Sequence, residues 1–269
     1  MIERVFGYAG LALLVYVAAA LHAHVDWHRF ADGFVPEAHS SSLYAYFAIG
    51  IVAAALMPYE IYFYSSGGIE EGWSQSDLPV NRMNSIIGYG LGAVLAAAIM
   101  VTGAQVLLPR GIEPESIGTT LLTAAVPFGV TGLVLASVGV MFAVGGAAVD
   151  TGFSAAYNIA QYLGWDWGKH AHGAPRWRAT WVAMFIGAYA VIASGIDPVQ
   201  LTEYAVVLSV VAMPLTYLPV VLAAGDRDLM GEHANGPVMR GLGWLYFGLV
   251  CVLAVAAPIL LVVTNGGGG

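Results

Sequence analysis

The stretch from 54 to 68 combines chemical features that an apolar segment rarely holds together. Met57, Pro58 and Glu60 lie within a run that is otherwise apolar or aromatic up to Tyr64, and two serines and a glycine pair follow. A proline inside a helix removes one backbone hydrogen bond and clashes with the preceding turn. In lipid, the carbonyls freed in this way must find partners within protein or in a water-filled cavity. Because interrupted helices hold the substrate and ion sites of secondary transporters, this stretch predicts carriage of a small solute, most simply an ion.

Two residues of this stretch have the chemistry of metal ligands. The thioether of Met57 favours soft or transition metals over hard cations such as magnesium or calcium. Unwinding of the helix at Pro58 would also expose carbonyls near Ala54, which are hard oxygen ligands. The alternative interpretation is that Met57 only fills a gap between packed helices, which is the usual role of methionine.

Glu60 is the one carboxylate well inside an apolar segment of this chain. Placing an ionisable group there costs at least about 2.5–3.5 kcal/mol on insertion scales. We therefore expect Glu60 to face a cavity, the interior of the helix bundle or a partner, as a proton-relay or gating group. The alternative is a structural carboxylate held by hydrogen bonds from Tyr62, Tyr64 or Ser65.

Composition identifies an integral membrane protein. Of the 269 residues, 59% are hydrophobic and 10% are charged, and the mean hydropathy is +0.76. Soluble domains carry roughly 25% charged residues. The nine basic residues form no patch for nucleic acid. No phosphate-binding loop or nucleophile elbow is present, so we expect neither an enzyme nor a bound cofactor.

Seven segments are candidates for helices that cross a bilayer, for which roughly 20 apolar residues are needed. We expect one all-α transmembrane domain over 1–269, with spans at 5–23, 43–66, 84–108, 124–149, 177–195, 201–224 and 241–264. The sixth span carries Pro214 and Pro219 together with Ser209, Thr216 and Tyr217, which predicts a kinked and partly polar helix. Asp150 indicates the inner end of the fourth span.

The basic residues predict the orientation of these spans in the bilayer. Basic residues concentrate on the cytoplasmic side of membrane proteins. With the N-terminus in the cytoplasm, Arg29 and Arg110 fall outside and the remaining seven basic residues fall inside: Arg4, Arg82, Lys169, Arg176, Arg178, Arg227 and Arg240. The sequence therefore predicts a cytoplasmic N-terminus and an external C-terminus.

Three stretches resemble the Nramp (natural resistance-associated macrophage protein) family of divalent metal transporters. Residues 3–27 are similar to the fifth helix of the family and its exit. Residues 54–59 resemble the Ala-x-x-Met-Pro-His signature of its broken sixth helix. Residues 207–232 resemble its tenth helix and the loop that follows. The order and spacing of the three stretches also fit, so the resemblance covers essentially the whole chain.

The resemblance implies a LeuT-like fold of inverted repeats, of which this chain would hold the second repeat and flanking helices. It implies that the backbone carbonyl of Ala54 and the sulfur of Met57 are metal ligands at mid-membrane. Proton-coupled transport of manganese or iron(II) is the activity of the family, with the metal ion as substrate. We expect the inner membrane of a bacterium as the location.

The chain also departs from the family pattern. Tyr59 stands where the family has a histidine tied to proton movement, and Glu60 replaces an asparagine. Tyrosine, with a pKa of about 10, cannot titrate like histidine at neutral pH, which leaves Glu60 as the candidate titrating group. The Asp-Pro-Gly-Asn break of the family's first helix has no counterpart, since Asp197 and Pro198 lie in a predicted outer loop.

We therefore expect the C-terminal portion of a longer transporter that lacks the first four helices. Those helices or a complementary chain would then be its partners, besides the lipid bilayer, the divalent cation and protons. Two alternatives stay open. One is a non-transporting or degenerate Nramp-like membrane subunit, and the other is an Nramp-like carrier with an altered substrate.

Overall fold

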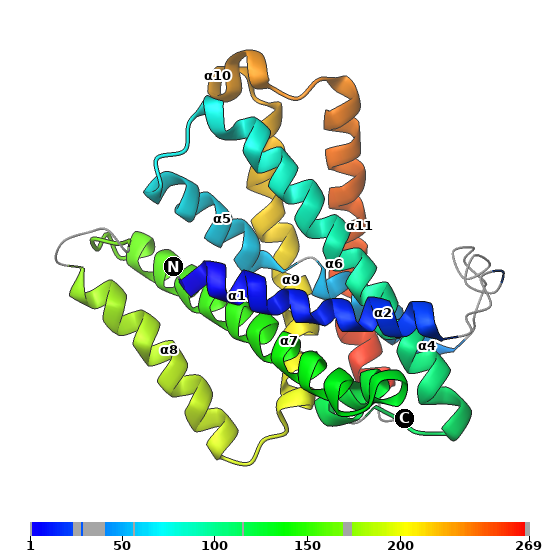
Figure 1. Ribbon diagram of the computed structural model, residues 1–269. Coiled ribbons are helices and arrows are strands. Elements are labelled where there is room, and N and C mark those ends of the chain that lie inside the picture. Colours follow the sequence, from blue (N-terminus) through cyan, green and yellow to red (C-terminus); the bar gives the residue numbers. More distant parts are fainter. Residues whose placement is uncertain are drawn as a thin grey trace. The chain divides into compact units, whose positions relative to one another are not determined.

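The computed structural model describes residues 2–23, 28, 41–55, 57–114, 116–168 and 174–266 (Figure 1). Over these residues the secondary structure is helical and contains no strand, as expected for an all-α membrane protein. The chain divides into two compact units. The first comprises Met1–Glu37, Gly67–Phe153 and Gly168–His170, and the second comprises Ala38–Ser66, Ser154–Trp167 and Ala171–Gly269.

The first unit contains the N-terminal helices, the long helix α6 and the larger part of the helix α7. Its elements are α1 (Ile2–Gly10), the 3-10 turn η1 (Leu11–Leu13), α2 (Leu14–His22), η2 (Gln75–Asp77), α6 (Leu78–Val106), η3 (Leu108–Arg110) and the first part of α7 (Ile117–Tyr162).

The second unit contains both halves of the interrupted segment and the C-terminal helices. Its elements are α4 (Ser42–Ala54), α5 (Pro58–Glu70, of which 67–70 belong to the first unit), the end of α7 from 154 onward, α8 (Pro175–Ala193), α9 (Pro198–Gly225), α10 (Arg227–Met230), η4 (Gly231–His233) and α11 (Pro237–Val263).

Among the described residues, six helical stretches are long and apolar enough to cross a membrane, against about seven expected. They are Val5–His22, Ser42–Glu70, Gln75–Arg110, Ile117–Tyr162, Pro198–Gly225 and Pro237–Val263, and each overlaps a predicted span. The predicted span at 177–195 coincides with α8, a helix of 19 residues. This helix is not among the six, because Arg176 and Arg178 in its first turn lower its mean hydropathy.

Small residues let the N-terminal helices approach α7 closely in the first unit. A Cβ atom at Gly139 would lie 2.7 Å from the backbone nitrogen of Leu13, and one at Gly145 would lie 2.8 Å from the ring of Phe6. Figure 1 shows α1 and α2 (blue) running beside α7 (green). Close approach at small residues is how helices associate in lipid, where hydrophobicity gives little drive.

The helix α7 extends beyond the predicted fourth span (124–149) at both ends, because it begins at Ile117 and ends at Tyr162. It bends at Gly129, whose φ of 58° and ψ of −142° are accessible mainly to glycine. It then continues past Asp150 to Tyr162, instead of ending where the sequence turns polar. The extension is helical because its inner face is buried, with Ser154 and Tyr157 at most 2% exposed. Packing of these last turns therefore determines where α7 ends, although the polar Asp150 predicted an earlier end.

The core of the second unit is formed where α9 packs along α11, with α4 against both helices. Figure 1 shows α9 and α11 side by side over most of their length. The buried apolar residues at this junction are Tyr46, Ala53, Val207, Val210, Leu253 and Ala257. The helix α4 is thus held by apolar side chains.

Candidate metal site

The interrupted segment lies between α4 and α5. The helix α4 ends at Ala54, and the N–H of its C-cap Ala55 donates to the carbonyls of Val52 and Ala53. The helix α5 begins at Pro58, a first position where the missing N–H of proline is not needed. Proline also disfavours helical geometry in the residue before it. Ala55 and Met57 therefore lie outside both helices.

Pro58 has a direct consequence for Ala54. In a continuous α-helix, the N–H of residue 58 would donate to the carbonyl of residue 54. Pro58 has no N–H, so Ala54 ends its helix with a carbonyl that helical geometry leaves unsatisfied. The C-terminal end of α4 also carries the negative end of the helix dipole. Both effects make this carbonyl a suitable oxygen ligand for a cation.

Glu60 lies in the first turn of α5, and its backbone N–H donates to the carbonyl of Met57 at 3.2 Å. A carboxylate in the first turn of a helix is stabilised by the positive end of the helix dipole. This position gives a structural reason for a carboxylate at residue 60, in addition to the proton role expected from the sequence. The side chain of Glu60 is half-buried, as are those of Tyr59 and Met57.

The sulfur of Met57 contacts Ser209 of α9. The Ser209 hydroxyl lies 3.9 Å from the sulfur and 2.8 Å from the carbonyl of Val206 in its own helix. A hydroxyl has one hydrogen, and the shorter bond to the carbonyl oxygen is the stronger one. The hydrogen therefore points at Val206, and the sulfur lone pairs of Met57 stay available to a ligand.

Hydrogen bonds from two other helices hold α5. The hydroxyls of Tyr62 and Thr216 are 2.7 Å apart, which links α5 to α9. The Ser154 hydroxyl donates to the carbonyl of Tyr59 at 3.0 Å, and the Gln161 amide donates to the Ser66 hydroxyl at 3.0 Å. Tyr59 and Ser66 are seven residues apart, as are Ser154 and Gln161, so α5 lies parallel to the end of α7 over about two turns.

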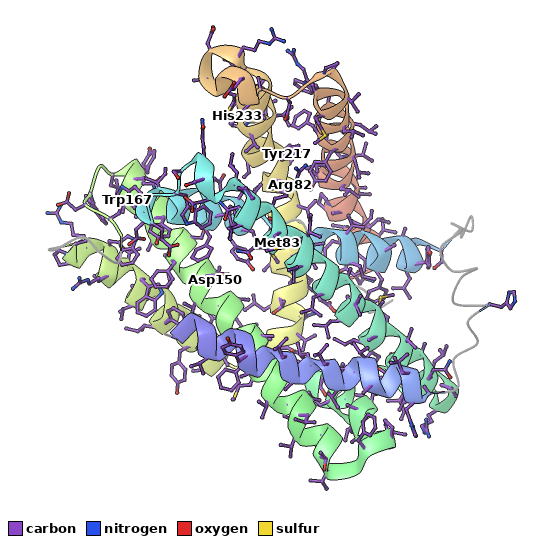
Figure 2. All side chains as sticks on the ribbon, turned by 45° about the horizontal axis from the view of Figure 1, so that its top comes forward. Arg82, Met83, Asp150, Trp167, Tyr217 and His233 are labelled. Atoms are coloured by element: carbon purple, nitrogen blue, oxygen red, sulfur yellow. The ribbon has the colours of Figure 1, made fainter. Side chains whose placement is uncertain are left out.

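The sequence identified some of these partners and missed others. Ser209 and Thr216 were expected in a partly polar sixth span, and the structure places both against the interrupted segment. Tyr217, labelled in Figure 2, lies elsewhere: its ring packs against Tyr246 of α11 with centroids 4.7 Å apart. Ser154 and Gln161 were missed because their partners lie 95 residues away in sequence and no local pattern connects them.

No group of three or more histidine, cysteine, aspartate or glutamate side chains gathers anywhere in the described part of the chain. The ligands that the interrupted segment offers are a backbone carbonyl and a thioether instead. A mixed set of this kind matches a transition-metal cation better than magnesium or calcium.

The fold and this segment define an all-α membrane protein in which the span formed by α4 and α5 is interrupted. A family model described as natural resistance-associated macrophage protein-like matches residues 1–260, so the chain belongs to the Nramp family. The predicted resemblance is thereby confirmed.

Bacterial proteins named divalent metal cation transporter MntH are among its curated relatives. The protein from Deinococcus radiodurans is 26% identical over 252 residues, which cover 91% of this chain and 55% of the relative. The one from Caldanaerobacter subterraneus is 25% identical over 260 residues, covering 93% and 59%. The one from Aeromonas hydrophila is 26% identical over 255 residues, covering 88% and 59%. The chain thus spans between half and two thirds of the length of these relatives.

Proposed function

We propose that this chain supplies the interrupted-helix part of a membrane transporter for divalent metal cations. The observation that carries the proposal is the break between Ala54 and Pro58, which leaves the carbonyl of Ala54 without a helical partner. Met57, whose thioether is the second candidate ligand, immediately precedes Pro58. Membership of the Nramp family and the names of its relatives support the same function.

In this proposal Ala54 and Met57 contact the cation, which is the substrate. The carbonyl oxygen contributes the negative end of a dipole, and the thioether contributes selectivity for transition metals such as manganese or iron(II) over magnesium and calcium. Ser209 keeps the sulfur in place by contact, without using its lone pairs.

We propose further that transport is coupled to protons and that Glu60 is the titrating group. A carboxylate near the break can exchange a proton as the cation enters or leaves, whereas a phenol, the group that Tyr59 carries, has an ordinary pKa of about 10. The first-turn position of Glu60 in α5 brings it within one helical turn of Met57.

One carbonyl and one thioether are too few ligands for a divalent cation in lipid, which takes additional oxygen ligands. Because the relatives are longer than this chain, we propose that further helices, or a complementary chain, add an anionic oxygen to the site. We propose the bacterial inner membrane, with the N-terminus in the cytoplasm, as the setting.

Manganese uptake tests the transport proposal. Cells without manganese transporters of their own would express this chain alone, or together with the part of the Deinococcus radiodurans relative that the chain does not match. We expect manganese uptake only when both parts are expressed together. In that combination, Met57→Leu lowers the uptake, whereas the control Met184→Leu in α8 does not. Absence of uptake in both cases, or equal uptake with and without Met57, would overturn the proposal.

A further inference from the structure

A pocket far along α9 from the interrupted segment is not used by the proposed transport. It lies in the second unit, at the connection from α9 to α11 that contains α10 and η4. Its volume is about 540 Å³. Small-molecule sites range over roughly 300–1,000 Å³. The loop around it is tied to the helix end, since the N–H of Asn235 donates to the carbonyl of Ala224 at 2.8 Å. The pocket is therefore large enough for a small molecule or a headgroup.

Two arginines line this pocket. Arg227 opens α10, and Arg240 lies in the first turn of α11. A Cβ atom at Gly225 would lie 3.3 Å from Nε of Arg240, so the absence of a side chain at Gly225 lets Arg240 lie against the end of α9. Neither guanidinium has an ion-pair partner among the described residues. Two residues with cationic, planar donor groups thus line one pocket.

The acidic groups of the same loop do not cancel this charge within the pocket. Asp226 is the one acid in the lining, and its carboxylate accepts the N–H of Asp228 at 2.8 Å, as the N-cap of α10. Asp228 is not part of the lining. Glu232 lies 3.8 Å from His233, which Figure 2 labels at the η4 turn, and neither lines the pocket. The lining therefore holds two positive charges against one negative.

The rest of the lining is mainly apolar. Pro219 and Leu222 come from the last turns of α9, and Leu229 comes from α10. The first two residues belong to a helix that is apolar enough to span the membrane. A ligand that fits must therefore carry an anionic head for the arginines and an apolar part that reaches toward the membrane.

From this arrangement we propose that the pocket binds the phosphodiester headgroup of an anionic phospholipid. Guanidinium groups match phosphate oxygens with paired hydrogen bonds, and basic pockets at the ends of membrane helices are suited to anionic headgroups. The positive-inside bias predicts that this end of α9 faces the cytoplasm, where the lipid would come from the inner leaflet. The acyl chains lie along Leu222 and Pro219.

Calorimetric titration of the full chain in a neutral detergent tests the proposal. The probes are dihexanoyl phosphatidylglycerol, dihexanoyl phosphatidylcholine and inorganic phosphate. We expect saturable binding of phosphatidylglycerol that is about tenfold weaker in the Arg227→Gln, Arg240→Gln double variant, because charge-assisted hydrogen bonds to phosphate are lost. The matched control Arg178→Gln, at an exposed arginine of α8, binds like the unmodified chain.

The two other probes separate a lipid site from a site for free anions. Phosphatidylcholine, which has no net charge, and inorganic phosphate, which has no acyl chain, should each bind more weakly than phosphatidylglycerol. Equal affinity for phosphate and phosphatidylglycerol would overturn the lipid assignment, and so would equal affinity for the two lipids. If the double glutamine variant does not fold, the single variants Arg227→Gln and Arg240→Gln replace it, and each should weaken binding. Unchanged affinity in the glutamine variants, or no saturable binding in the unmodified chain, would also reject the proposal.

Discussion

The hydroxyl oxygens of Tyr62 and Thr216 lie 2.7 Å apart, so a side chain of α5 is hydrogen-bonded to a side chain of α9. The other half of the same interrupted segment is held differently. Tyr46 and Ala53 of α4 belong to a buried apolar cluster with α9 and α11. One half is thus fixed by directional polar contacts and the other by packing. Substitutions in the hydrogen bond and in the apolar cluster can therefore measure separately how much each half contributes to the free energy of unfolding.

The first prediction concerns the Tyr62–Thr216 bond itself. Tyr62→Phe and Thr216→Val each destabilise the folded chain, and we expect a coupling free energy of about 0.6 kcal/mol between them, as for other hydrogen bonds between membrane helices. Unfolding in detergent mixtures, applied as a double-mutant cycle, measures this coupling. Tyr189→Phe, at a tyrosine of α8 that is 73% exposed, is the control and leaves stability unchanged. Strictly additive effects of the two variants would show that the bond contributes nothing.

A second prediction separates Met57 from its neighbour Ser209. Because the Ser209 hydroxyl donates to the carbonyl of Val206, Ser209→Ala should change the affinity for cadmium by less than about threefold. Met57→Leu removes the soft ligand and should weaken cadmium binding by about tenfold, with a smaller effect on manganese. Binding is measured by calorimetry on the chain reconstituted together with the part of the Deinococcus radiodurans relative that it does not match. A larger loss from Ser209→Ala than from Met57→Leu would mean that the hydroxyl, and not the sulfur, is the ligand.

The third prediction tests why the helix is interrupted. Pro58→Ala restores an N–H that can donate to the carbonyl of Ala54 and relaxes the restriction on Met57. The two helices can then join, and we expect cadmium affinity to fall by about tenfold because the carbonyl is no longer available. Pro258→Ala, at a proline inside α11, is the matched control and leaves binding unchanged. The explanation fails if Pro58→Ala binds cadmium as tightly as the unmodified chain.

The fourth prediction concerns the contact of Gly139 with Leu13. A Cβ atom at residue 139 would lie 2.7 Å from a backbone nitrogen and 2.9 Å from Cγ of Leu13, so the backbone must shift. Gly139→Ala should therefore lower the free energy of unfolding by about 1–3 kcal/mol, as overpacking does. Gly92→Ala in α6 meets nothing within 4 Å and should be neutral or slightly stabilising. Equal free energies of unfolding for the two variants would show that the backbone of α7 can shift at residue 139 without loss of stability.

The sequence alone determined the class of protein and the position of the break. Membrane crossing depends on length and apolarity, which are local properties, and six of the predicted spans overlap apolar helical stretches of sufficient length among the described residues. The interruption at Pro58 was equally readable, because the missing N–H of proline acts on its own helix. The family resemblance rested on the same local residues, and a family model bears it out.

The tertiary structure alone decided which side chains surround the break and where α7 ends. Thr216 lies 154 residues from Tyr62, and Ser154 lies 95 residues from Tyr59, so no local periodicity brings either pair together. The continuation of α7 past Asp150 likewise depends on burial of its last turns. Local chemistry fixes where a helix breaks, because the backbone bond is lost within one turn. The partners that satisfy the broken segment are chosen by packing between distant helices, and that packing is a property of the folded chain.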